Sequence, residues 1–108
     1  MQDRNVRAEI EFPVIEREGG FSFWCRALNV SSSGILIERG DQTAKRRGSL
    51  MRLELHLPGL ARPLEVNASF VWSEGSKLGL KFVGLADADR LTLAETLDTV
   101  RKCGGVLN

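Results

Sequence analysis

Residues 64–82, with the sequence LEVNASFVWSEGSKLGLKF, decide the fold class. Apolar and polar residues alternate in the first half of this stretch, and the apolar set comprises Leu64, Val66, Ala68, Phe70 and Trp72. A period of two is typical of a β-strand with one buried face. Residues 74–76 suit a hairpin connection, and the alternation then resumes with Leu78, Leu80 and Phe82. The stretch therefore predicts two neighbouring strands whose apolar sides face one core.

The same period of two recurs in the N-terminal half of the chain. It predicts four more strands, at residues 8–16, 21–28, 35–38 and 50–57. The strand at 50–57 is the clearest, because its apolar residues alternate strictly with Arg52, Glu54 and His56. In the strand at 21–28, the side expected to face the core consists of Phe21, Phe23, Cys25 and Ala27.

The last part of the chain changes its period. Leu93, Leu97 and Val100 are spaced i, i+4 and i+7, which predicts an amphipathic helix over residues 87–103. Six short strands followed by one helix indicate a mainly β protein, built as a small barrel or a sandwich. Closure into a barrel removes the unpaired strand edges that promote aggregation.

Composition limits the function classes. The chain has 108 residues, of which 43% are hydrophobic and 27% charged, so we expect one ordinary globular domain. A net charge of +1 argues against a DNA-binding protein. The absence of a long apolar run argues against membrane insertion, and residues 1–7 lack the apolar segment of a signal peptide, which favours a cytoplasmic location. We expect Cys25 and Cys103 to be reduced thiols.

The sequence offers little for catalysis. His56 is the single histidine, and no nucleophile, phosphate-loop or metal motif accompanies it. We therefore expect no enzymatic activity, no metal and no cofactor. The basic run at 45–47 is interpreted as a solvated loop or, alternatively, as a patch for an acidic partner. Trp24 alone among the aromatic residues falls on the polar side of its strand, so a row of stacking aromatics for single-stranded nucleic acid is not evident.

Residues 29–34, NVSSSG, are more informative. Asn29 and Ser31 can bond nearby backbone amides in a turn, and Gly34 permits a positive φ or a close approach of the backbone to a ligand. A plain turn between two strands is the alternative interpretation. Arg4 and Arg7 lie just before the first strand, either as a solvated tail or as a cationic arm that closes over an anionic ligand.

With the strand plan, these features resemble the PilZ domain, a bacterial receptor module for cyclic di-GMP. Four segments carry the resemblance, LNVSSSGILI at 28–37, LELHLP at 53–58, VNASFVW at 66–72 and LGLKF at 78–82. The resemblance covers nearly the whole chain and implies a six-stranded antiparallel barrel with one C-terminal α-helix. The expected organisation is a single domain over 1–108, with a flexible arm at 1–7, the barrel at 8–83 and the helix at 87–103.

The family's ligand motifs are RxxxR before the first strand and [D/N]xSxxG after the second. Residues 29–34 match the second motif in full. The first motif departs from the family pattern, because Asp3 occupies the position of its first arginine, four residues before Arg7. The resemblance implies that the cyclic di-GMP-binding residues are Arg4, Arg7, Asn29, Ser31, Gly34 and Trp72.

Two hypotheses follow. In the first, the chain is a receptor in which cyclic di-GMP orders the arm, and an effector protein reads the resulting surface. In the second, the chain is a PilZ-like protein-interaction module that has lost nucleotide binding, which the aspartate at position 3 favours. An oligonucleotide-binding barrel is a third interpretation, disfavoured by the near-neutral charge.

Overall fold

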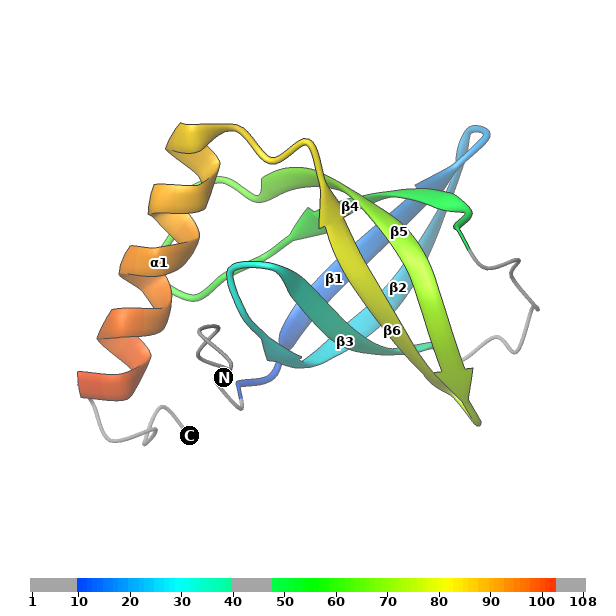
Figure 1. Ribbon diagram of the computed structural model, residues 1–108, viewed down its shortest axis with the longest axis horizontal. Coiled ribbons are helices and arrows are strands. Elements are labelled where there is room, and N and C mark those ends of the chain that lie inside the picture. Colours follow the sequence, from blue (N-terminus) through cyan, green and yellow to red (C-terminus); the bar gives the residue numbers. More distant parts are fainter. Residues whose placement is uncertain (1–9, 40–47, 103–108) are drawn as a thin grey trace.

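A computed structural model describes residues 10–39 and 48–102 of the chain, with side chains described up to residue 99 (Figure 1). The secondary-structure elements within these ranges are β1 (Phe12–Glu18), β2 (Phe21–Val30), β3 (Gly34–Arg39), β4 (Leu50–Leu55), β5 (Leu64–Glu74), β6 (Lys77–Val83) and α1 (Asp87–Lys102).

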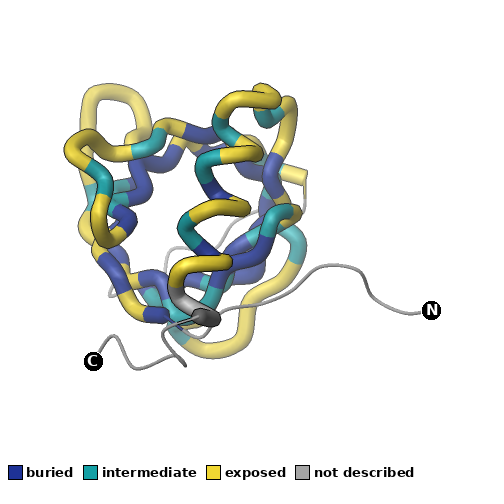
Figure 2. Tube along the Cα trace, turned by 90° about the vertical axis from the view of Figure 1, so that its left-hand side faces the viewer, coloured by how far each residue is buried: buried dark blue, intermediate teal, exposed yellow. Residues whose placement is uncertain are grey.

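The six strands form a closed barrel in the order β1-β2-β3-β6-β5-β4, with β4 pairing back onto β1. All neighbouring strands are antiparallel. Figure 2 shows the strands as a ring, with α1 lying across one opening. The predicted fold class, a six-stranded antiparallel barrel with one C-terminal helix, is confirmed. Because each of the six described strands has two partners, none of them forms an edge of the sheet along its whole length.

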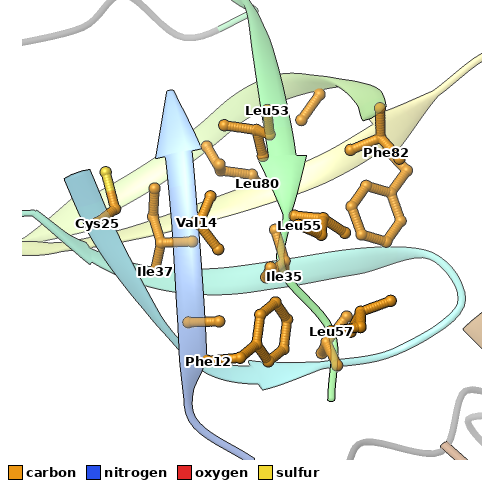
Figure 3. Close-up of a cluster of buried hydrophobic side chains, with 14 of the residues drawn as sticks. Phe12, Val14, Cys25, Ile35, Ile37, Leu53, Leu55, Leu57, Leu80 and Phe82 are labelled. Carbon is orange, nitrogen blue, oxygen red and sulfur yellow. The ribbon is translucent and has the colours of Figure 1, made fainter. Parts of the chain in front are cut away.

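The hydrophobic core fills the ring. Val14, Ile37, Leu53 and Leu55 are 0% exposed, and Figure 3 shows their side chains pointing into the barrel from β1, β3 and β4. Full burial of a side chain of this size stabilises a fold by about 1.5–3 kcal/mol. The alternation of apolar residues therefore determines which side of each strand faces inward.

Helix α1 contributes to the same core. Leu93 is 0% and Leu97 6% exposed, so the predicted apolar stripe faces the barrel. The helix runs from Asp87 to Lys102, close to the predicted range, while residue 103 lies outside the described part of the chain. Acidic residues in the first turn of a helix interact favourably with its dipole, which suits the start at Asp87.

The first two strands differ from their predicted bounds. β1 ends at Glu18 rather than at residue 16, and Gly19 and Gly20, with φ angles of 55° and 89°, join it to β2 in a tight hairpin turn. The β1–β4 pairing ends at Arg17, so the tip of this hairpin has no neighbouring strand on that side. Phe21 is consequently 70% exposed, and the prediction that it faces the core is wrong.

The bounds of β3, β4 and β5 differ from the predicted ones by one or two residues. β4 ends at Leu55 instead of residue 57, although Leu57 remains buried. β5 continues to Glu74, two residues beyond its predicted end, because its pairing with β6 extends to Lys77 at the hairpin. β3 gains one residue at each end of its predicted range.

One ion pair is buried between β1 and β3. Glu16 and Arg39 are 1% and 2% exposed, and Arg39 Nε lies 3.1 Å from Glu16 Oε1. The Arg39 guanidinium also lies 5.4 Å from the centre of the Phe23 ring. Phe23, predicted to face inward, is half-buried and covers this charged group. Loss of either ionic partner would leave a buried charge unpaired, which is strongly destabilising.

Candidate ligand-binding site

The turn between β2 and β3 is held together by the Ser31 side chain. Ser31 Oγ accepts hydrogen bonds from the backbone N–H groups of Ser33 and Gly34, each at 3.2 Å. The Ser31 N–H donates to the Gly34 carbonyl oxygen at 2.9 Å. Ser31 is only 3% exposed. Its hydroxyl therefore fixes the shape of the turn, as predicted for a serine that bonds nearby backbone amides.

Gly34 is required by a close approach of two backbones. A Cβ atom at this position would lie 2.5 Å from the carbonyl oxygen of Leu80 in β6. The φ angle of Gly34 is not positive, so of the two alternatives that the sequence left open, the left-handed backbone does not apply. A larger residue would push β3 and β6 apart, because the obstructing atom belongs to a backbone and not to a flexible side chain.

Asn29 lies in a strand and not in the turn that was predicted. β2 continues to Val30, and Asn29 pairs with Leu36 of β3. The register shifts between Ala27 and Asn29, which marks a β-bulge. A β-bulge changes the side of the strand on which the following side chains lie. Here Asn29 is half-buried and lies beside the turn.

Trp72 does not face the core, contrary to the prediction from alternation. The β5–β6 register shifts between Phe70, which pairs with Leu80, and Trp72, which pairs with Gly79. The extra residue moves Trp72 to the outside of the barrel, where it is 45% exposed. Its indole lies against Gly79, because a Cβ at Gly79 would come within 2.8 Å of Trp72 Cδ1.

These features border one shallow cavity of about 240 Å³ on the outside of β3, β5 and β6. The cavity is lined by Ser33, Gly34, Ile35, Leu36, Val71, Trp72, Gly79, Leu80 and Lys81. The lining holds an indole, small and aliphatic residues and one ammonium group, but no carboxylate. Aromatic walls with few polar groups suit a flat, partly apolar ligand, and the single positive charge favours an anionic one.

The structure therefore brings together three of the predicted site positions. Gly34 and Trp72 line the cavity, and Ser31 shapes the turn that forms its border. Sequence alternation placed Trp72 incorrectly and missed Lys81 as a lining residue. Arg4, Arg7, Asp3, the basic run at 45–47 and Cys103 lie outside the described residues.

Other candidates for chemistry lie elsewhere. His56 is half-buried, with its ring centre 6.2 Å from that of Trp24 and its Nε2 3.7 Å from Glu54 Oε1. Within residues 10–39 and 48–102, no group of three or more potential ligands could hold a metal ion. In the same ranges, no helix has the length and apolar character needed to span a membrane.

The described part of the chain is thus a closed barrel with a shallow cavity, bordered by Trp72, on its outer surface. Residues 2–98 match the model of the PilZ domain. The chain therefore belongs to the PilZ family, whose domain is a non-catalytic binding module.

Solved structures show the same fold. The inhibitor of motility MotI/DgrA of Bacillus subtilis is 19% identical, with a TM-score of 0.81 over 95% of this chain, which spans 52% of that protein. The PilZ domain of YcgR from Escherichia coli, solved with c-di-GMP, is 10% identical, with a TM-score of 0.75 over 96% of this chain and 95% of that one. The PilZ domain of CeSA from a cellulose-synthesizing bacterium is 10% identical, with a TM-score of 0.72 over 89% of this chain and 98% of that one. No curated protein sequence matches the chain.

Proposed function

We propose that this chain is a cyclic di-GMP receptor module that relays the level of the messenger to a partner protein in the cytoplasm. The observation that carries the proposal is the outer cavity, which Gly34 and Trp72 both line and which borders the turn shaped by Ser31. Membership in the PilZ family and the c-di-GMP in the similar YcgR domain support the choice of ligand.

Each residue has a distinct role in the proposed complex. The Trp72 indole stacks on a guanine, since flat aromatic surfaces favour offset stacking. Gly34 and the turn let the base approach the barrel, and Asn29 contacts its polar edge. Arg4 and Arg7 bind phosphate or guanine, both of which suit the forked donors of arginine.

Binding would convert the N-terminal arm into part of a recognition surface. The arm carries the two arginines, and cyclic di-GMP presents anionic groups that draw it toward the barrel. An effector protein that recognises the closed arm would sense only the liganded state. Such a disorder-to-order transition is a common form of molecular switch.

Isothermal titration of the chain with cyclic di-GMP tests the proposal. Arg7→Ala should weaken binding by about tenfold, because a charge-assisted contact is lost. Its melting temperature should not change, since a terminal arginine contributes little to folding. Asp3→Arg should strengthen binding by about tenfold, because it adds a cation and removes a carboxylate near the phosphates. An absence of binding by both the wild type and Asp3→Arg would refute the receptor proposal.

The second candidate is a protein-interaction module without a nucleotide. It is favoured by Asp3 at the motif position of an arginine, and by Trp24, which is 67% exposed on the outer face of β2. Exposed aromatic residues are enriched at protein interfaces. If this second function is correct, the titrations with cyclic di-GMP detect no binding. Trp24→Ala then abolishes binding of the partner protein without lowering the melting temperature.

A further inference from the structure

We propose that Lys81 binds a phosphate of the ligand. It would supply, from the barrel itself, the positive charge that is missing from the RxxxR motif, in which Asp3 replaces the first arginine. This inference rests on the proposed function of the cavity. It goes further by assigning a phosphate contact to a residue that neither of the two ligand motifs contains.

The position of Lys81 on β6 places it in the wall of the cavity. On β6, Lys81 pairs with Gly34 of β3 on one side and with Ser69 of β5 on the other. Its neighbours Leu80 and Phe82 are buried in the core, whereas Lys81 is exposed on the outer face and lines the cavity together with Trp72. Because Lys81 and Trp72 line the same cavity, we expect a phosphate of a ligand whose base stacks against the indole to come within the reach of the long lysine side chain.

The charge of Lys81 is available for a ligand. Arg17, Arg26, Arg39 and Arg52 each form an ion pair with a glutamate. Within the part of the chain that the structure describes, no carboxylate forms an ion pair with Lys81, and none lines the cavity. Lys81 therefore gives up no ion pair with a described carboxylate when it binds a phosphate.

Lys77 provides a matched comparison on the same strand. It lies on the outer face of β6, on the far side of Gly79, and does not line the cavity. It pairs in register with Glu38, whose pKa is lowered chiefly by a hydrogen bond from Arg26 and to a smaller extent by the charge of Lys77. Both lysines contribute equally to the net charge, but Lys77 lies beside the Glu38 carboxylate and outside the cavity, whereas Lys81 lines the cavity.

The test is isothermal titration with cyclic di-GMP at low and high salt, using the wild type, Lys81→Gln, Lys81→Arg and Lys77→Gln. Lys81→Gln should weaken binding about fivefold at low salt. The difference should shrink at high salt, since ions screen an exposed charge pair. Lys81→Arg should keep the wild-type affinity because it keeps the charge, and Lys77→Gln should also match the wild type. Thermal melts of all four proteins should coincide, because both lysines are exposed.

Three results would overturn the inference while leaving the receptor function intact. They are unchanged binding by Lys81→Gln, equal weakening by Lys77→Gln, and a loss in Lys81→Arg as large as that in Lys81→Gln. A wild type that does not bind cyclic di-GMP at all would refute the proposed function and this inference together.

Discussion

The contact between Trp72 and Gly79 makes a quantitative prediction about the wall of the cavity. Gly79→Ala places a methyl group where the indole now lies, since the added Cβ would come within 2.8 Å of Trp72 Cδ1 and nearer still to other ring atoms. The indole must then move away from β6. Because Trp72 is already 45% exposed, it can move outward without disrupting the core.

The expected free-energy changes follow from this geometry. Overpacking a well-filled site typically lowers the free energy of unfolding by about 1–3 kcal/mol. Because the indole can move outward, we expect Gly79→Ala to cost about 1 kcal/mol, at the lower end of this range. In a Trp72→Ala background the methyl group meets no ring. Gly79→Ala should then be neutral or stabilising by up to about 1 kcal/mol, because alanine reduces the freedom of the unfolded chain. The two substitutions should therefore couple by about 1–2 kcal/mol, as residues in contact do.

Urea unfolding of the four proteins in this double-mutant cycle measures the coupling. Far-UV circular dichroism is the appropriate signal, because Trp72→Ala removes one of the two tryptophans and alters fluorescence. Gly79→Ala should also weaken cyclic di-GMP binding, since the displaced indole no longer forms the cavity wall. If Gly79→Ala changes the free energy of unfolding equally in both backgrounds, the contact between Gly79 and Trp72 is refuted. The proposed stacking of a guanine on the Trp72 indole in this position is then refuted as well.

Three further predictions concern the turn and an ion pair on the barrel. Gly34→Ala should destabilise by about 1–3 kcal/mol in urea unfolding, because its Cβ meets the carbonyl oxygen of Leu80; a neutral result would contradict the close approach. Ser31→Ala should lower the free energy of unfolding by about 1 kcal/mol, since two backbone N–H groups lose their acceptor; unchanged stability would assign the hydroxyl to the ligand alone. The hydrogen bond from Arg17 lowers the pKa of Glu54 in the folded state, so this pair stabilises the fold above the ordinary carboxyl pKa, and the stabilisation is lost as the pH falls through the lowered value. The melting temperature of the wild type should therefore fall more steeply below about pH 4 than that of Glu54→Gln, and parallel acid profiles would contradict this prediction.

The fold was predictable because period-two alternation decides which side of each strand is buried. That signal fails where the period is interrupted. Bulges after Ala27 and after Phe70 are set by pairing with a neighbouring strand, so the local sequence does not reveal them. Alternation accordingly placed Trp72 on the core-facing side of its strand, although the family resemblance also named it as a ligand-binding residue. The sequence did hold one usable signal, Gly79, since a glycine inside a strand often marks a close approach of another group.

The hairpin tip illustrates a second limit. Phe21 continues the inward phase of β2, yet the β1–β4 pairing ends at Arg17 and the β2–β3 pairing at Cys25, so β1 is the one strand that pairs with the hairpin tip around Phe21 in the described part of the chain. Strand lengths in a barrel depend on where each neighbour ends, which is information about the closed sheet rather than about one segment. Burial predicted from alternation therefore holds in the middle of the barrel, as at Cys25 and Ala27, and fails at its ends.

The contacts of Ser31 and Gly34 change what the second ligand motif means. Ser31 Oγ is an acceptor for two backbone amides, and Gly34 makes room for the backbone of β6. Both requirements exist whether or not a ligand is present, so a PilZ barrel without nucleotide binding would need the same two residues. A match to this motif consequently indicates the fold more strongly than the ligand. Under the proposed function, ligand binding would depend instead on side chains that the barrel does not need for folding, namely Trp72, Lys81 and the arm arginines. Substitutions of these residues would therefore distinguish a receptor from an interaction module.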